Sequence, residues 1–283
     1  MSYVPPAELA RAMVDAGHSK VLTSTRDTLI RAFMGGALLT LAAAFAVTVT
    51  VQTGNALLGA ALFPVGFCLL YLLGFDLLTG VFTLAPIAYL DRRPGVTIGA
   101  VLRNWGLVFL GNFAGAFTVA VIITFVLTYG YSIPPNDVAE KLMHIGEGRT
   151  IGYAEHGAAG MATLFLRGVL CNWMVSTGVV AAMMSKHVTG KVLGMWMPIM
   201  LFFYMGFEHS VVNMFLFPSG LLLGADFTIA DYLVWNEIPT VLGNLVGGFV
   251  FVGLAIYTTH VRTRPKRAEV EIAPVPVRET ETV

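Results

Sequence analysis

The sequence predicts an all-α integral membrane protein with six transmembrane helices, the second and fifth of them broken, arranged as an inverted repeat. Composition is the first observation behind this prediction: 56% of the 283 residues are hydrophobic and only 12% are charged, whereas soluble domains are about 25% charged. The second observation is a series of six apolar segments, each long enough for the roughly 20 residues that cross a bilayer. The third is a set of motifs that recurs at one spacing of 132 residues.

Charge and cysteine usage exclude several classes of protein. The formal net charge is zero, and nucleic-acid binding needs a basic face, so we expect no nucleic-acid partner. Cys68 and Cys171 lie in apolar segments and are interpreted as small core residues rather than as a disulfide. Glu208-His209 lacks the H-E-x-x-H spacing of a zinc enzyme, and no nucleophile or phosphate-loop spacing occurs. We therefore expect no enzyme activity, no metal site and no cofactor.

The chain is expected to begin and end in the cytosol. Residues 1–27 are polar and are predicted to form an amphipathic helix that starts near Pro5-Pro6 and lies along the membrane surface. Residues 28–260 are expected to form one transmembrane domain, and the charged residues 261–283 to form a disordered tail. The six apolar segments are 28–51, 56–90, 101–129, 158–185, 192–222 and 236–259.

The second and fifth apolar segments are too long for one straight helix each. Each contains a glycine, a phenylalanine and an acidic residue in succession, followed later by Pro86 or Pro218. We interpret each segment as two half-helices joined by unwound backbone, which membrane proteins tolerate where it lines a cavity.

The distribution of lysine and arginine predicts the orientation. These residues gather before the first span, between the second and third, between the fourth and fifth, and after the sixth. The opposite loops contain only Lys141 and Arg149, both in the long loop at 130–157. Because cytoplasmic loops are enriched in lysine and arginine, both termini are expected in the cytoplasm.

Two motifs recur at the spacing of 132 residues. Gly-Phe-Asp at 74–76 recurs as Gly-Phe-Glu at 206–208, and Gly-Asn-x-x-Gly at 111–115 recurs at 243–247. Chance is unlikely to supply two matches at the same spacing. Three spans per half is an odd number, so the halves are expected to insert with opposite orientation and to meet at a site near the bilayer midplane. The predicted halves cover about 28–129 and 158–260.

The recurring polar residues are expected to be structural. Asn112 and Asn244 are predicted to hydrogen-bond the unwound backbone, in preference to binding substrate, because freed backbone groups must be satisfied in a membrane. The carboxylates of Asp76 and Glu208 are expected to accept the free N–H groups where a half-helix starts.

His209 breaks the repeat, because its counterpart in the first half is Leu77. An ionisable side chain at bilayer depth is costly and is a functional candidate by default. A histidine present in only one half is expected at a single central site.

Six motifs together point to one family. They are Gly-Phe-Asp-Leu-Leu-Thr-Gly at 74–80, Arg-Asn-Trp with Gly-Asn-x-x-Gly-Ala at 103–116, Leu-Cys-Asn-Trp-Met-Val at 170–175, Pro-Ile-Met-Leu-Phe at 198–202, Gly-Phe-Glu-His-Ser-Val-Val-Asn-Met-Phe at 206–215 and Gly-Asn-Leu-Val-Gly-Gly at 243–248. With these motifs the sequence resembles the formate/nitrite transporter family over about residues 5–262. The resemblance implies an aquaporin-like six-helix protomer and a homopentamer with one pore per protomer in a bacterial inner membrane. It implies transport of small monovalent anions, namely formate, nitrite, hydrosulfide, acetate or lactate.

The resemblance also implies roles for individual residues. His209 matches the central pore histidine, and Asn172 matches the asparagine that hydrogen-bonds it. Thr79 matches the threonine that faces the histidine from a mobile loop in the broken second helix. Asn213 belongs to the signature after the histidine and is expected to be structural. The pore constrictions are expected at Phe63, Phe67, Leu77 and Phe202.

One position departs from the family. Many members carry a lysine at the outer entrance, where this chain has His156 beside Glu155. His156 could attract an anion only when it is protonated, and Glu155 would oppose that attraction. The alternative is that both are ordinary loop residues facing water.

These expectations combine into a transport hypothesis. A charge at the bilayer centre costs at least about 2.5–3.5 kcal/mol, so a weak-acid anion is expected to take up a proton near His209 and Thr79 and to pass as the neutral acid. His209 could supply that proton or act only as a polar donor. Among the anions, formate is favoured over nitrite and hydrosulfide, and the expected partners are the anion, protons and the lipid bilayer.

Two other kinds of membrane protein remain as alternatives. A neutral-solute channel similar to aquaporin would suit the fold, but the paired Asn-Pro-Ala signature is absent. A purely structural membrane scaffold would leave the unpaired His209 unexplained.

Overall fold

The computed structural model describes residues 3–262, and its elements are helices throughout that range. The β-structure within it is an isolated bridge between Tyr3 and Ser185. The tail expected at 261–283 falls, apart from its first two residues, outside the described residues.

Within the described range, four helices are long and apolar enough to cross a membrane. They are α2 (Thr25–Thr53), α6 (Ile98–Leu127), α9 (Gly157–Met183) and the continuous helix Ile229–Arg262. This last helix contains α12 (Ile229–Tyr232), π-helical η1 (Leu233–Glu237), α13 (Ile238–Gly248), π-helical η2 (Phe249–Leu254), α14 (Ala255–Tyr257) and π-helical η3 (Thr258–Arg262).

Shorter apolar helices fill the two remaining apolar segments, and each segment is interrupted by non-helical backbone. The interruptions lie at 73–77 and 205–209, where the sequence carries the Gly-Phe-acid motif. Gly74 and Gly206 open them with φ angles of 74° and 65°, a left-handed conformation that glycine adopts without strain. The helices on either side are α3 (Ala56–Leu62), α4 (Pro64–Leu72) and α5 (Leu78–Leu90) in the first segment, and α10 (Val188–Tyr204) and α11 (Ser210–Leu223) in the second.

Glycines let the long helices approach closely in the same way in both halves. A Cβ atom added to Gly115 of α6 would lie 2.0 Å from the Phe33 carbonyl oxygen of α2. A Cβ atom added to Gly247 of α13 would lie 2.1 Å from the Val169 carbonyl oxygen of α9. Real Cβ atoms do not come this near to other heavy atoms, so small residues are required at both helix contacts.

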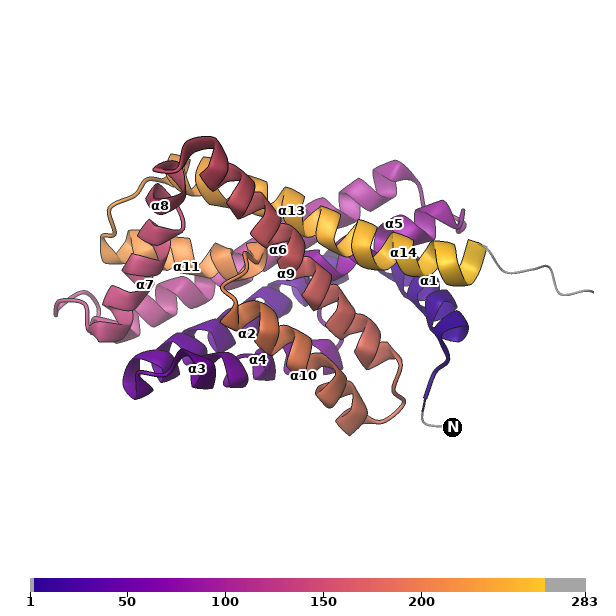
Figure 1. The fold of residues 1–283 in the computed structure, drawn as a ribbon, viewed down its shortest axis with the longest axis horizontal. Helices are drawn as coiled ribbons and strands as arrows, with labels where there is room; N and C mark the ends of the chain where they lie inside the picture. Colours follow the sequence, from indigo (N-terminus) through magenta and orange to yellow (C-terminus); the bar gives the residue numbers. More distant parts are fainter. Residues whose placement is uncertain (1–2, 263–283) are drawn as a thin grey trace, which may run out of the picture.

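The amino-terminal helix packs on the bundle. In α1 (Pro6–Leu22), the apolar face is buried, and Gly17 lies directly against the Leu84 carbonyl of α5. Figure 1 shows α1 and α14 at one end of the molecule. The apolar face of α1 is therefore covered by protein, and the position of residues 1–27 along a membrane surface stays a prediction.

Two helices occupy the stretch at 130–157, where the sequence analysis expected a loop. They are α7 (Asp137–Gly148) and the short α8 (Ile151–Ala154). Asn136 caps α7 by accepting the Ala139 N–H at 3.1 Å. Both helices lie at the end of the molecule opposite α1 (Figure 1), and α7 packs on α11 and α2.

Candidate functional site

His209 is the last residue before α11 and caps that helix. Its backbone is extended, and its Nδ1 accepts the Val212 N–H at 3.4 Å. In a neutral imidazole one ring nitrogen accepts and the other donates. The hydrogen of the neutral ring is therefore on Nε2, which points to Thr79 Oγ1 across a long contact of 3.5 Å. Both side chains are buried.

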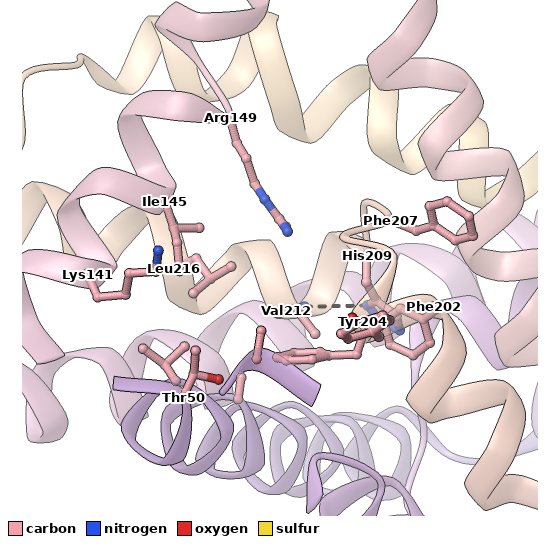
Figure 2. Close-up of a pocket in the computed structure, with 14 residues that line it drawn as sticks. Thr50, Lys141, Ile145, Arg149, Phe202, Tyr204, Phe207, His209, Val212 and Leu216 are labelled. Carbon is pink, nitrogen blue, oxygen red and sulfur yellow. Dashed lines mark hydrogen bonds between the residues drawn. The ribbon is translucent and has the colours of Figure 1, made fainter. Parts of the chain in front are cut away.

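A hollow of about 150 Å³ reaches His209 from the side of α7. We call it the α7-side hollow. Phe202, His209 and Val212 line its inner end, and Lys141 and Arg149 line it from α7 and the residue that follows. Figure 2 shows the Arg149 guanidinium extending into the space between α7 and His209.

A second hollow of about 160 Å³ reaches Thr79 from the side of α1. We call it the α1-side hollow. Phe67, Leu77 and Thr79 line it together with Lys20 and Asp76. Because His209 lines the first hollow and Thr79 the second, the contact between these two side chains lies between the hollows.

Aromatic side chains pack around His209. The Phe202 ring lies 5.5 Å from the imidazole and 5.7 Å from the Phe63 ring, measured between centroids. Phe63 lines neither hollow and stacks on Phe203 at 3.9 Å. Phe202 lines the α7-side hollow, Phe67 and Leu77 line the α1-side hollow, and Phe63 packs against Phe202. That these four residues form the pore constrictions stays a prediction.

Asn112 and Asn244 hold the interrupted backbone in the same way. Asn112 accepts the Leu78 N–H at 2.9 Å and donates to the Asp76 carbonyl at 2.8 Å. Asn244 accepts the Ser210 N–H at 3.0 Å and donates to the Glu208 carbonyl at 2.9 Å. Each asparagine also donates to a carbonyl of a neighbouring long helix, that of Ala32 or of Gly168. The two amide side chains therefore satisfy backbone groups that the missing helical turns leave free.

Asn172 and Thr79 differ from the expected arrangement. Asn172 does not bond His209; its amide donates to the carbonyls of Thr79 at 3.1 Å and Asn244 at 2.6 Å, and it accepts from Ser176. Thr79 lies in the first turn of α5 and not in the non-helical segment. Asn172 therefore acts on the site by holding the start of α5.

The carboxylates of Asp76 and Glu208 bind side chains, which corrects the prediction that they accept helix-start N–H groups. The side-chain oxygens of Asn112 and Asn244 already accept hydrogen bonds from the first N–H groups of α5 and α11. Asp76 pairs with Lys20. Glu208 is fully buried and accepts hydrogen bonds from four side chains. Its donors are Tyr153 Oη at 2.8 Å, Asn213 Nδ2 at 2.9 Å, Asn236 Nδ2 at 3.3 Å and Arg149 at 3.5 Å.

Lys20 and Arg149 have equivalent surroundings at the two hollows. Lys20 pairs with Asp76, and Asn104 donates to the Lys20 carbonyl at 3.0 Å. Arg149 pairs with Glu208, and Asn236 donates to the Arg149 carbonyl at 3.0 Å. The acids and the asparagines each follow the spacing of 132 residues, but the two bases do not. The repeat therefore does not reveal these two bases.

Tyr153 connects Glu208 to a second arginine. Its hydroxyl donates to Glu208 and accepts from Arg167 at 2.8 Å. Burial, and then the nearby charge of Glu208, raise the pKa of Tyr153 to about 12. The hydroxyl therefore stays protonated near neutral pH and remains a donor to Glu208.

His156 and Glu155 are exposed and do not line the α7-side hollow. His156 lines a separate polar depression with Tyr153, Thr163 and Arg167. The bases that line the α7-side hollow are Lys141 and Arg149, and Arg149 pairs with Glu208, the residue before His209. Whether His156 takes the place of the family's lysine or is an ordinary loop residue stays a prediction.

Known proteins resemble this chain over nearly its whole length. The family model described as formate/nitrite transporter matches residues 7–258. An uncharacterized transporter of Bacillus subtilis, YrhG, is 30% identical over 96% of this chain and 99% of its own, and the formate channel BtFdhC of Bacillus thuringiensis is 31% identical over 92% and 97%. A pentameric formate channel solved with formate bound has a TM-score of 0.68 at 24% identity, covering 83% of this chain and 97% of its own. Members of this family are transporters and channels, and the chain described here belongs to the formate/nitrite transporter family.

Proposed function

We propose that this protein carries a small monovalent weak-acid anion, formate before nitrite or hydrosulfide, across a membrane. The observation that carries the proposal is the contact between His209 and Thr79, which lies between two hollows that each contain a base. The formate channels among its relatives support the choice of formate.

The bases favour entry of an anion, and the centre favours a neutral species. Arg149 and Lys141 at one hollow and Lys20 at the other attract negative charge. Between them the path is bounded by buried Phe202 and Leu77, where an ion loses hydration and a charge is costly. Formate that takes up a proton before this point passes as formic acid, and it releases the proton in the second hollow.

His209 acts in this scheme as a polar donor. With Nδ1 accepting the Val212 N–H, the ring is neutral and offers Nε2–H to the substrate. A neutral ring that gave up this hydrogen would become an imidazolate, so the proton that neutralises formate comes from hydronium in the solution on the entry side. Protonated His209 would have two donors and would lose the capping bond to α11.

The proposed topology has six crossings. The helices interrupted at 73–77 and 205–209 would each cross once as a pair of half-helices, and the four long helices would cross uninterrupted. The end with α1 and α14 would face the cytoplasm of a bacterium and the end with α7 the outside, in agreement with loop charge. A homopentamer is proposed from the pentameric neighbour.

A His209→Asn variant tests the donor role. Asparagine keeps an N–H donor and cannot hold a proton, so we expect formate uptake that still rises as pH falls, within about threefold of the parent. The measurement is radiolabelled formate uptake by a transport-deficient bacterium from about pH 5 to pH 8, with nitrite as competitor.

Three results would contradict parts of the proposal. Uptake by His209→Asn that no longer depends on pH would make His209 the proton donor. Flat uptake by the parent protein would mean passage of the anion itself. Osmotic swelling of proteoliposomes in glycerol would indicate a neutral-solute channel.

A further inference from the structure

A third buried carboxyl group, besides those of Asp76 and Glu208, has no part in the scheme above. Glu237 ends the π-helical segment η1 within the helix Ile229–Arg262, and it is 3% exposed. Its counterpart at the spacing of 132 residues is Trp105, so it does not belong to the repeat. An acidic residue inside a membrane-spanning helix is a functional candidate, and π-helical turns are common at functional sites.

The hydrogen-bond partners of Glu237 are hydroxyl groups. Ser210 Oγ donates to Oε1 at 2.5 Å, and Tyr232 Oη donates to Oε2 at 2.9 Å. Glu208, by contrast, is paired with Arg149. Both oxygens of Glu237 accept in this arrangement. A proton bound to either oxygen would turn that oxygen into a donor, and the direction of one of the two bonds would have to reverse.

Ser210 connects this carboxyl group to the centre of the pore. It is the first residue of α11 and directly follows His209. Its N–H is held by Asn244, so its hydroxyl bond to Glu237 is a second anchor for the start of the helix. A reversal of this bond would act one residue away from the imidazole.

The other titratable and charged groups nearby belong to the elements that pack around η1. Glu208 is the acidic neighbour of Glu237. The side chains that donate hydrogen bonds to Glu208 hold its carboxylate in place. The set comprises Glu208 and His209 before α11, Tyr232 on α12, Tyr153 on α8, Arg149 between α7 and α8, and Arg167 on α9. Two carboxyl groups in one buried network titrate as a coupled pair when they interact strongly.

We propose that Glu237 is a proton-binding residue that positions His209 through Ser210, so that its protonation adjusts transport to pH. The inference rests on the proposed passage of substrate past His209. In the deprotonated form, Ser210 and Tyr232 both donate to the carboxylate. In the protonated form, the new O–H on Oε1 donates to Ser210 Oγ, and the anchor on the start of α11 changes.

The test uses the full-length protein in proteoliposomes and three variants. Glu237→Gln keeps the shape of the side chain but cannot titrate. Ser210→Ala keeps the carboxyl group of Glu237 and removes the hydroxyl that connects it to the start of α11. Glu8→Gln replaces an exposed acid on α1 and is the control. Infrared difference spectra recorded across about pH 5 to pH 8 follow protonation of carboxyl groups without requiring transport. Formate uptake over the same range gives the pH profile.

We expect Glu237→Gln to lose a carboxyl band and to shift the midpoint of the uptake profile by about one pH unit, the coupling at which such groups titrate together. Ser210→Ala is expected to keep the band and to shift the midpoint similarly, and Glu8→Gln to change neither. Unchanged spectra for Glu237→Gln would overturn proton binding, and an unshifted profile for Ser210→Ala would overturn the connection. If Glu237→Gln fails to fold, a parent spectrum with no titrating carboxyl band overturns the proposal. If the parent carries no formate, the proposed function fails while the spectra still test Glu237.

Discussion

Replacing Asn244 with leucine is expected to lower the free energy of unfolding by about 3 kcal/mol or more. The side chain of Asn244 satisfies the Ser210 N–H and the carbonyls of Glu208 and Gly168, all of them buried. Each buried polar group left without a partner costs about 1–3 kcal/mol. Leucine has a similar volume, so the loss reports hydrogen bonding and not a cavity. The measurement is thermal unfolding in detergent, followed by the loss of monodisperse protein.

Two further variants serve as comparisons for Asn244→Leu. Asn112→Leu removes the equivalent three bonds in the first half and is expected to destabilise by a similar amount. Asn55→Ala removes a single exposed helix cap, for which about 1 kcal/mol is typical. An unfolding temperature for Asn244→Leu as high as that for Asn55→Ala would show that water or other groups satisfy the freed backbone.

Replacing Arg149 with methionine is expected to reduce formate uptake about tenfold and to destabilise the protein by about 2 kcal/mol. The carboxylate of Glu208 would remain buried without its cation. Breaking a fully buried ion pair costs about 3–5 kcal/mol. We expect a smaller loss here because the Arg149 side chain is 24% exposed and lies 3.5 Å from the carboxylate. Uptake falls further because the α7-side hollow loses a positive charge close to His209.

Lys141→Met is the matched control for Arg149→Met. Lys141 lines the same hollow, but it is exposed and none of the ion pairs in the described part of the chain involves it. We expect its loss to weaken the dependence of uptake on ionic strength and to change stability by less than about 0.5 kcal/mol. Arg149→Lys should recover most of the uptake. Equal behaviour of Arg149→Met and Lys141→Met in uptake and unfolding would show that the pair with Glu208 is unimportant.

Much of this fold can be predicted from the apolar pattern and the internal repeat. Segment 28–51 corresponds to α2, and the Gly-Phe-acid motifs fall where helical backbone stops because glycine adopts the left-handed turn there. The hydrogen bonds of Asn112 and Asn244 could also be predicted. Backbone polar groups freed inside a membrane need partners, and the repeat places one asparagine near each interruption.

The bases at the two hollows could not be found in this way. Lys20 lies in the last turn of α1 and Arg149 follows α7, so the two bases come from segments that differ between the halves. Only folding brings each base to its acid. The sequence of α7 does contain a local helix pattern, in which Asn136 precedes Val138, Ala139 and Leu142 at helical spacing. These three side chains are buried in the structure. The amphipathic pattern was obscured by the polar composition of the stretch.

The two interruptions also determine the electrostatic potential at the centre of the molecule. Both α5 and α11 begin at the contact between Thr79 and His209, so two helix amino-termini meet there. Each helix dipole places about half a positive elementary charge at its amino-terminus. The two helix termini thus contribute positive potential at this contact without a charged side chain in the pair. On the proposed path, this contribution would repel a cation and attract an anion without the strong ion pair that would keep it from leaving.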